Sequence, residues 1–300
     1  MNIVVTGATS FLGSNIIKKL MQNEDNRIWA VVRPNSKNRS NIPQKKNVKI
    51  VEVDMEEIEI LYEKVDESID IFYHLAWEGV RAPQRDDEKI QQANYRASVK
   101  TIQVCQKLGA KRFIGAGSQA EYGKMNGEIT ENYPCTPLTE YGKEKYKTYQ
   151  YISNYAKEHG IEFIWTRIFS IYGIGDYKGS LIMNCIEKMQ RNESIELTEC
   201  VQEWDYLYID EAAEIFAKMA YESELQGVYN VASGVHKPLK EFIEIIKKQL
   251  NSESVLEFGK VPYPETGMVS FIPSILKLKN DLLWSSQITF EEGIKLILKG

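Results

Sequence analysis

The sequence predicts an α/β protein with a doubly wound parallel sheet, followed by a smaller C-terminal α/β lobe. Three observations predict this class. Short β-branched runs alternate with segments of helical period up to about residue 170. A glycine turn at 7–13 follows the first run, and a glycine- and serine-rich segment at 115–123 follows the fifth. Ligands of open parallel sheets bind where such strand ends meet.

The first 20 residues form the first unit of this pattern. A β-branched run at 2–6 predicts a buried strand, and apolar residues at helical spacing over 11–20 predict a helix. The glycines allow a sharp turn and close packing of this helix on the strand, and the helix N-terminus offers free N–H groups to a pyrophosphate. The spacing G-x-x-S-x-x-G lacks the usual middle glycine, so an ordinary tight turn would also explain it. The residues expected to hold a dinucleotide here are Gly7, Ser10, Phe11, Leu12 and Gly13.

The remaining elements follow in order. Further strands are expected at 27–32, 48–53, 69–74, 111–115 and 162–168, and helices at 86–108, closed by Gly109, and from Tyr141 to about 159. Beyond residue 170 the alternation fades, and we expect helices at 180–191, from 210, at 239–250 and at 290–298, and extended segments at 195–197, 203–209 and 227–232. The predicted domains are therefore a dinucleotide-binding Rossmann domain over 1–170, with re-entry at about 205–232, and a lobe over 171–300 that mainly binds the substrate.

The end of the second strand carries no acidic residue. NAD sites usually place a carboxylate there for the ribose hydroxyls, whereas this chain has Arg33, Ser36 and Arg39. These groups suit a 2′-phosphate and so favour NADP(H) over NAD, although a solvated basic loop has the same composition.

Other strand ends carry further candidates. Asp54 can accept a hydrogen bond from the adenine amino group or cap the next helix, and the small Ala76 permits close approach of a cofactor. We interpret His74 as a packed structural histidine rather than a catalytic one.

Bulk composition excludes several classes. The chain has 300 residues, 43% of them hydrophobic and 26% charged, with a net charge of −5, which does not predict a nucleic-acid-binding face. Four widely spaced cysteines indicate free thiols in a reducing compartment and no metal site. We find no apolar run long enough to cross a membrane, and a strand at the N-terminus leaves no room for a signal peptide, so we expect a cytoplasmic protein without membrane partners.

Three pieces together are specific: the glycine turn, Ser118 at a strand end, and Tyr141 with Lys145 one helical turn later. In this order the chain resembles the extended short-chain dehydrogenase/reductase family, in its nucleotide-sugar branch of NAD-dependent epimerases and dehydratases. The resemblance covers nearly the whole chain and is carried by TGATSFLG, Asp54, HLAW, Asn94, GAGSQAEYG, YGKEK, RIFSIYG and WDYLYIDEAA.

The resemblance implies a role for each catalytic candidate. Tyr141 would donate a proton to a carbonyl oxygen, and Ser118 would hydrogen-bond the same oxygen. Lys145 would lower the pKa of the tyrosine and bond the nicotinamide ribose. Further expected cofactor contacts are Asp54, Met55, Leu75, Ala76, Asn94 and Ile168, and expected substrate contacts are Trp77, Gln119, Tyr141, Phe169, Ser170 and Trp204.

Departures from the family pattern narrow the reaction. Gln119-Ala120 replaces the Asp-Glu pair of the 4,6-dehydratases, and Ala120 and Gly175 replace the cysteine and histidine of the 3,5-epimerase-reductases. Ser170 stands where asparagine is usual, and Trp204 where many relatives have a diphosphate-binding arginine, so the nucleotide end of the substrate site is expected to be unusual.

The leading interpretation is an NADPH-dependent reductase of the C4 ketone of a nucleotide-activated 4-keto-6-deoxyhexose, serving deoxysugar and surface polysaccharide biosynthesis. One alternative is a 4-epimerase with tightly bound NAD, which uses the same three residues. Another is a dinucleotide-binding protein without catalysis, which the presence of both Tyr141 and Lys145 disfavours. The resemblance also implies a homodimer formed through the helix at 86–108 and the helix from Tyr141.

Overall fold

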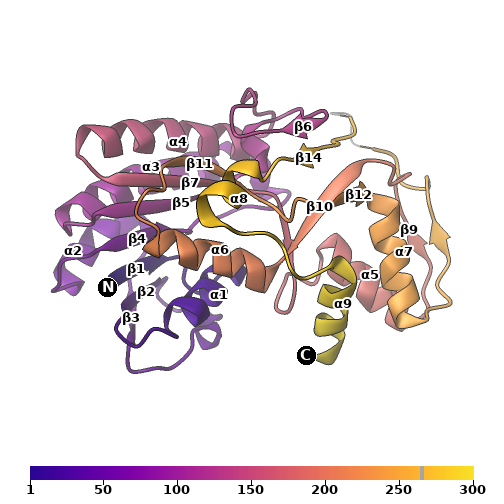
Figure 1. Ribbon diagram of the computed structural model, residues 1–300, viewed down its shortest axis with the longest axis horizontal. Helices are drawn as coiled ribbons and strands as arrows, with labels where there is room; N and C mark the ends of the chain where they lie inside the picture. The colour runs from indigo at the N-terminus through magenta and orange to yellow at the C-terminus, as the bar shows by residue number, and fades with distance from the viewer. Residues whose placement is uncertain (264–266) are drawn as a thin grey trace. The chain divides into compact units, whose positions relative to one another are not determined.

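A seven-stranded parallel sheet forms the centre of the first of two structural units in the computed structural model, which describes residues 1–263 and 267–300 (Figure 1). The strand order is β11-β7-β5-β4-β1-β2-β3, and every pairing is parallel. The strands are β1 (Asn2–Thr6), β2 (Arg27–Val32), β3 (Val48–Glu52), β4 (Ile71–His74), β5 (Arg112–Ser118), β7 (Glu162–Ile168) and β11 (Gly227–Val231). The order reverses between β1 and β4, which is where doubly wound sheets bind their ligands.

Helices cover both faces of this sheet (Figure 1). On β4, Phe72 packs into a cluster with residues of the helices on one face, while the hydroxyl of the next residue, Tyr73, donates to the Phe216 carbonyl on the other. The helices of this unit are α1 (Phe11–Leu20), α2 (Leu61–Lys64), α3 (Glu88–Lys107), α4 (Glu140–Glu158) and most of α6 (Ile209–Tyr221), with 3₁₀ turns η1 (Arg39–Asn41), η2 (Met55–Ile60), η3 (Gln84–Asp86) and η4 (Gln119–Glu121).

The second unit contains residues 125–132, 169–212 and 232–300 among those described. Its strands form three small sheets, β12-β10-β8, β13-β9 and β14-β6. The strands are β6 (Glu128–Ile129), β8 (Ser170–Tyr172), β9 (Ile195–Glu196), β10 (Glu203–Tyr208), β12 (His236–Pro238), β13 (Leu256–Glu257) and β14 (Ile272–Pro273), and the helices are α5 (Leu181–Gln190), α7 (Leu239–Leu250), α8 (Leu276–Leu282) and α9 (Phe290–Lys299). An aromatic cluster of Tyr172, Tyr206, Phe242 and Phe290 lies in its core.

The predicted α/β class with a doubly wound parallel sheet is confirmed, with local differences. The fifth strand extends from 111–115 through Ser118, because pairing with β7 continues to Ile168. The segment after Asp54 forms a 3₁₀ helix before the short α2. The chain returns to the first unit at 213–231, whereas β10, inside the expected re-entry of 205–232, pairs within the second unit. The sequence did not predict β6, β8, β12, β13, β14 or α8, which are short and lack a periodic pattern of their own.

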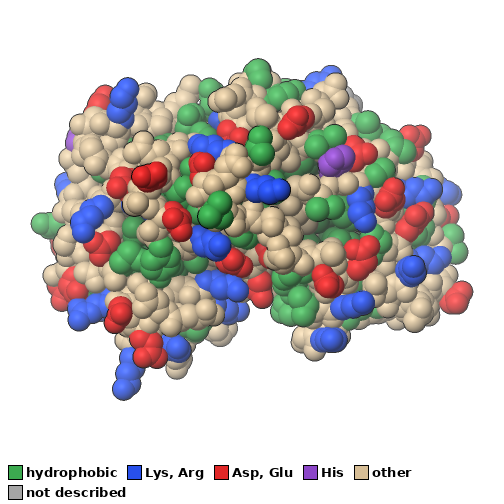
Figure 2. Space-filling view, in the orientation of Figure 1, with side chains coloured by type: hydrophobic (Ala, Val, Ile, Leu, Met, Phe, Trp, Pro, Cys, Tyr) green, Lys and Arg blue, Asp and Glu red, His purple; other side chains and the backbone are tan. Residues whose placement is uncertain are grey.

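Across the described ranges 1–263 and 267–300, no helix is both long and apolar enough to cross a bilayer. The same residues bring together no group of three or more histidine, cysteine and acidic side chains that would hold a metal ion. Acidic and basic side chains are interspersed on the face shown in Figure 2.

Candidate active site

Ser118 lies at the carboxyl end of β5, in the middle of the sheet. The Trp165 ring of β7 packs directly against this strand and leaves room only for glycine at positions 115 and 117. A Cβ at Gly115 would lie 2.4 Å from that ring, and a Cβ at Gly117 would lie 2.2 Å from its nitrogen. Ser118 is also the N-cap of η4, and its Oγ accepts a hydrogen bond from the Ala120 amide at 3.2 Å.

Helix α4 brings Tyr141 to the serine. Thr139 caps the helix by accepting from the Gly142 amide, and Gly142 permits close contact with η4, because a Cβ there would lie 2.5 Å from the Ala120 carbonyl oxygen. The buried Tyr141 lies near enough to the Ser118 side chain for that hydroxyl to lower the pKa of the phenol. Burial raises the pKa of Tyr141 above its ordinary value, while the Ser118 hydroxyl and the charge of Arg85 partly oppose that rise.

Lys145, one turn further along α4, is 4% exposed. Its Nζ donates to the Ala116 carbonyl at 2.7 Å and lies 3.7 Å from the centroid of the Trp77 ring, a cation–π contact. Burial lowers the pKa of Lys145 to about 7, and the charge of Glu121 opposes this shift. Burial makes the net shift of the Tyr141 pKa upward, and the charge of Arg85 opposes it. That Lys145 also lowers this pKa stays a prediction.

A buried ion pair that sequence reasoning missed lies beneath Ser118. Glu121 is fully buried and its Oε2 accepts from Arg167 Nε at 3.0 Å, while its Oε1 accepts from the Ser118 amide at 2.8 Å and from Trp165 Nε1 at 3.0 Å. The spacing Ser118-x-x-Glu121 is that of a capping box, so the contact between Glu121 and Ser118 could have been predicted from the sequence. Nothing local to the sequence indicated the link to Arg167, 46 residues away.

The glycine turn has the geometry that close approach of a dinucleotide requires. Gly7 has φ +68°, and a Cβ there would lie 2.7 Å from the Ala76 nitrogen. A Cβ at Gly13 would lie 2.3 Å from the Gly7 carbonyl, so helix and turn are in direct contact. Ser10 caps α1 by accepting from the Gly13 amide, and the amides of Phe11 and Leu12 have no partner within the helix. These groups fit a pyrophosphate.

The basic segment lies beside this turn. Asn41 Nδ2 donates to the Thr9 carbonyl at 3.2 Å, which fastens 33–41 to the glycine turn. Arg33 and Arg39 are exposed arginines of this segment, and they form ion pairs with Glu78 and Glu52 respectively. Ser36 is half-buried between them in the sequence.

The other expected cofactor residues have defined local roles. Asp54 caps η2 by accepting from the Glu56 amide, and Met55 follows it at the start of that turn. Asn94 bonds both the amide and the carbonyl of Glu78, at 2.9 and 2.8 Å. Leu75 and Ala76 lie against Gly7, and Ile168 ends β7 opposite Ser118.

His74 is packed as expected. It is buried between the hydroxyls of Thr6 and Ser98, at 3.0 and 2.8 Å, and burial lowers its pKa to about 3. The imidazole is therefore neutral at physiological pH, which makes it a structural group.

The expected substrate residues divide between the units. In the first, Trp77 touches the Tyr141 ring edge-on at 6.0 Å between centroids. Gln119 follows Ser118, and its buried Oε1 has no hydrogen-bond partner among the described residues. In the second, Trp204 Nε1 donates to Ser170 Oγ at 2.9 Å, and Phe169 and Trp204 both contact Phe271.

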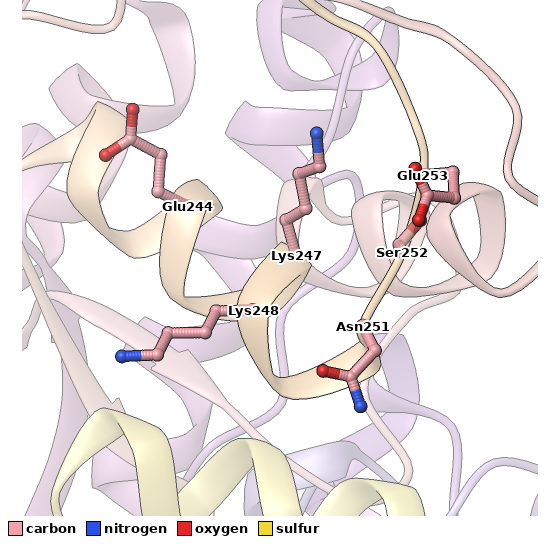
Figure 3. Close-up of a pocket in the computed structure, with 6 residues that line it drawn as sticks. All are labelled: Glu244, Lys247, Lys248, Asn251, Ser252 and Glu253. Carbon is pink, nitrogen blue, oxygen red and sulfur yellow. The ribbon is translucent and has the colours of Figure 1, made fainter.

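A surface depression at the C-terminal end of α7 belongs to a different part of the chain (Figure 3). It is lined by Glu244, Lys247, Lys248, Asn251, Ser252 and Glu253, and Figure 3 shows these side chains pointing in different directions. None of the catalytic candidates lines it.

Comparison with known proteins places this site in a family. Residues 3–232 match the NAD dependent epimerase/dehydratase family, a stretch that contains the glycine turn, Ser118, Tyr141 and Lys145. The chain belongs to this family. The match agrees with the resemblance inferred from the motifs, and the glycine turn and α1 N-terminus fit the dinucleotide in the family's name.

Relatives within the family differ in activity. The chain is 28% identical to CDP-abequose synthase of Salmonella muenchen over 99% of this chain and 96% of that protein. It is also 28% identical to a putative UDP-glucose 4-epimerase of Methanocaldococcus jannaschii over 99% of this chain and 97% of that protein. Among solved structures, UDP-glucose 4-epimerase of Thermotoga maritima shares the fold with a TM-score of 0.89 at 23% identity, covering 100% of this chain and 98% of that one.

Proposed function

We propose that this protein is a nucleotide-sugar-modifying oxidoreductase that reduces the C4 ketone of a nucleotide-activated 4-keto-6-deoxyhexose with NADPH. The observation that carries the proposal is the approach of Tyr141 of α4 to Ser118 at the end of β5, with Lys145 one turn further along α4 and no acid–base pair at residues 119 and 120. The relatives with full-length matches include both a deoxysugar synthase and an epimerase, and both names support a nucleotide-sugar substrate.

The residues of the site divide the chemistry between them. Tyr141 donates its proton to the carbonyl oxygen as that oxygen gains negative charge, and Ser118 hydrogen-bonds the same oxygen. The family resemblance implies that Lys145, one turn after Tyr141, bonds the nicotinamide ribose. When bound, the nicotinamide supplies the hydride.

The positions after the serine limit the reaction to one carbon. Gln119 and Ala120 can neither donate nor accept a proton at neutral pH, so elimination between neighbouring carbons lacks its acid and base. The buried Oε1 of Gln119 is an acceptor, and we expect it to bond a hydroxyl of the substrate once the side chain turns toward it.

The preference for NADPH rests on the segment 33–41 beside the glycine turn. Two exposed arginines there suit a 2′-phosphate, whereas the 2′- and 3′-hydroxyls of an unphosphorylated ribose would add no charge to the ion pairs that these arginines make with Glu78 and Glu52. We expect tighter binding of NADPH than of NADH in a fluorescence titration, and Arg33→Ala should narrow the gap by about 1–3 kcal/mol. Equal affinities of the wild type for NADPH and NADH would contradict the proposed preference for NADPH.

A 4-epimerase with tightly bound NAD is the second candidate, because its chemistry uses the same serine, tyrosine and lysine. The names of several full-length relatives and fold neighbours favour it. The reductase transfers a hydride from NADPH to the sugar for good, whereas the epimerase removes a hydride from the sugar and then returns it.

The deciding experiment is incubation with several nucleotide 4-keto-6-deoxyhexoses, with NADPH absorbance and product mass followed together. A reductase consumes one NADPH per sugar and adds two mass units, with deuterium from labelled NADPH found only at C4. In deuterated water, no enzyme-dependent deuterium should enter C3 or C5. Interconversion of isobaric sugars without loss of NADPH would establish the epimerase instead.

We also propose a homodimer formed through α3 and α4. These helices pack side by side and carry half-buried tyrosines in mutual contact, Tyr95 with Tyr151 and Tyr151 with Tyr155. Light scattering coupled to gel filtration would report the mass, and a monomer at micromolar concentration would contradict the proposal.

A further inference from the structure

The segment between β4 and α3 brings two side chains onto the ring of Tyr141. Trp77 meets it edge-on, with an interplanar angle of 90°. Arg85, in η3, places its guanidinium carbon 5.0 Å from the centroid of the same ring. The two residues therefore enclose the tyrosine from positions 56 to 64 residues earlier in the chain.

Two amides of α3 fasten this segment. Gln91 is fully buried; its Nε2 donates to the carbonyls of Gly79 and Gln84 at 2.8 and 2.9 Å, and its Oε1 accepts from the Trp77 indole at 2.8 Å. Asn94 binds both backbone groups of Glu78. Because Gln84 immediately precedes Arg85, these bonds fix the backbone from which the guanidinium reaches Tyr141.

Arg85 differs from most arginines of the chain in what it faces. Six others form ion pairs with glutamates: Arg27, Arg33, Arg39, Arg112, Arg167 and Arg191. Arg85 is half-buried, yet it has no ion pair within the described part of the chain. A half-buried cation against an aromatic face, without a carboxylate, is placed to act on charge that appears at that ring.

Of the cations near the Tyr141 ring, Arg85 is closer to the ring centroid than Lys145, and the other groups around the ring have different contacts. Lys145 is 5.9 Å from the ring centroid and directs its ammonium toward the Trp77 ring and the Ala116 carbonyl. Glu121, from η4, has the opposite sign and is paired with Arg167. Ser118, from β5, is neutral, and its hydroxyl lowers the pKa of the phenol.

We propose that Arg85 is a positioning residue of the proposed reduction, whose guanidinium stabilises the phenolate that Tyr141 becomes when its proton passes to the substrate oxygen. In this step the phenol O–H bond breaks, a new O–H bond forms on the substrate, and the charge left on Tyr141 lies beside Arg85 until solvent returns a proton. The role rests on the proposed function, because it needs Tyr141 to be the proton donor. The charge of Arg85 also lowers the pKa of Tyr141 in the resting protein, against the effect of burial.

The test compares Arg85→Gln, Arg85→Lys and a matched control, Arg96→Gln, which removes the same charge from an exposed position of α3. Since Tyr141 must be protonated to react, kcat/KM should fall at high pH as it ionises. Arg85→Gln should move this decline of kcat/KM to higher pH. The expected displacement is about 0.6–2.4 pH units for one charge 5.0 Å from the ring centroid at an effective dielectric constant of about 20–80. Arg85→Lys should retain most of the wild-type position, and Arg96→Gln should leave it unchanged.

A second measurement is independent of turnover. A difluorotyrosine placed at position 141 has a more acidic phenol, which brings its titration into the range where the protein is folded, and its ¹⁹F shift reports ionisation. We expect the same upward displacement of the midpoint in Arg85→Gln and none in Arg96→Gln. An unchanged midpoint in folded Arg85→Gln would overturn the proposal, as would a lower plateau of kcat/KM with an unmoved decline at high pH, which a purely structural role predicts. If no nucleotide keto-sugar turns over, the proposed function fails, and the ¹⁹F titration still decides on Arg85.

Discussion

Removal of the Glu121 carboxylate tests how the site is held together. Glu121 is fully buried and Arg167 is 3% exposed, so Glu121→Ala leaves a guanidinium in the interior without this carboxylate. Breaking a buried pair from one side typically destabilises a protein by about 3–5 kcal/mol. The variant also leaves the Ser118 amide and the Trp165 indole N–H without their acceptor, so we expect a loss of at least about 3 kcal/mol, a large share of the roughly 5–15 kcal/mol that folded proteins have.

Urea denaturation followed by circular dichroism measures this loss as a lower midpoint at constant slope. Glu67→Ala is the control, because Glu67 pairs with Arg27 at the surface and exposed pairs contribute less than about 1 kcal/mol. The double variant Glu121→Ala/Arg167→Met should be more stable than Glu121→Ala alone, since it removes the cation that the single change leaves behind. A loss below about 1 kcal/mol in Glu121→Ala, or additive effects in the double variant, would refute this account.

Three further changes test separate features of the site. Burial lowers the pKa of His74 to about 3, whereas an unfolded histidine titrates near 6.5. Between pH ~3 and pH ~6.5 the unfolded chain therefore binds a proton that the folded protein does not. The contribution of His74 to stability should be greatest above pH ~6.5 and fall as the pH is lowered toward ~3. His74→Asn should weaken this dependence of the free energy of unfolding on pH, measured by urea titrations at several pH values, whereas substitution of the exposed His159 by Asn should not. The same pH dependence in His74→Asn and in the wild type would contradict a neutral, buried His74. Gly117→Ala would place a methyl group 2.2 Å from the Trp165 nitrogen and should cost about 1–3 kcal/mol or more, and a melting temperature equal to wild type would show that the strand can yield. Tyr141→Phe should lower turnover by about 10²–10⁴-fold with cofactor affinity little changed, and a near-normal rate would mean that another group protonates the oxygen.

The sequence by itself determined the parts of this protein that depend on neighbours along the chain. A β-branched run, a glycine turn and apolar residues at helical spacing predict the first strand, turn and helix without reference to any other segment. The helical spacing of Tyr141 and Lys145 likewise puts both on one face of α4, and Ser118 ends a strand of which the earlier part could be predicted from its own residues. The family motifs are built from these local features, which is why the family could be inferred from them.

Only the tertiary structure determined the pKa values of the site residues and which charged groups lie beside them. Burial raises the pKa of Tyr141 and lowers that of Lys145, and burial depends on the packing of α4 over the sheet rather than on spacing. The Lys145 ammonium faces Trp77, and the cation nearest Tyr141 comes from η3, because hydrogen bonds from α3 fold that segment back over the site. The pair of Glu121 and Arg167 joins η4 to β7. It forms because η4 follows β5, and β5 pairs in parallel with β7, so residues that lie far apart in the chain come together.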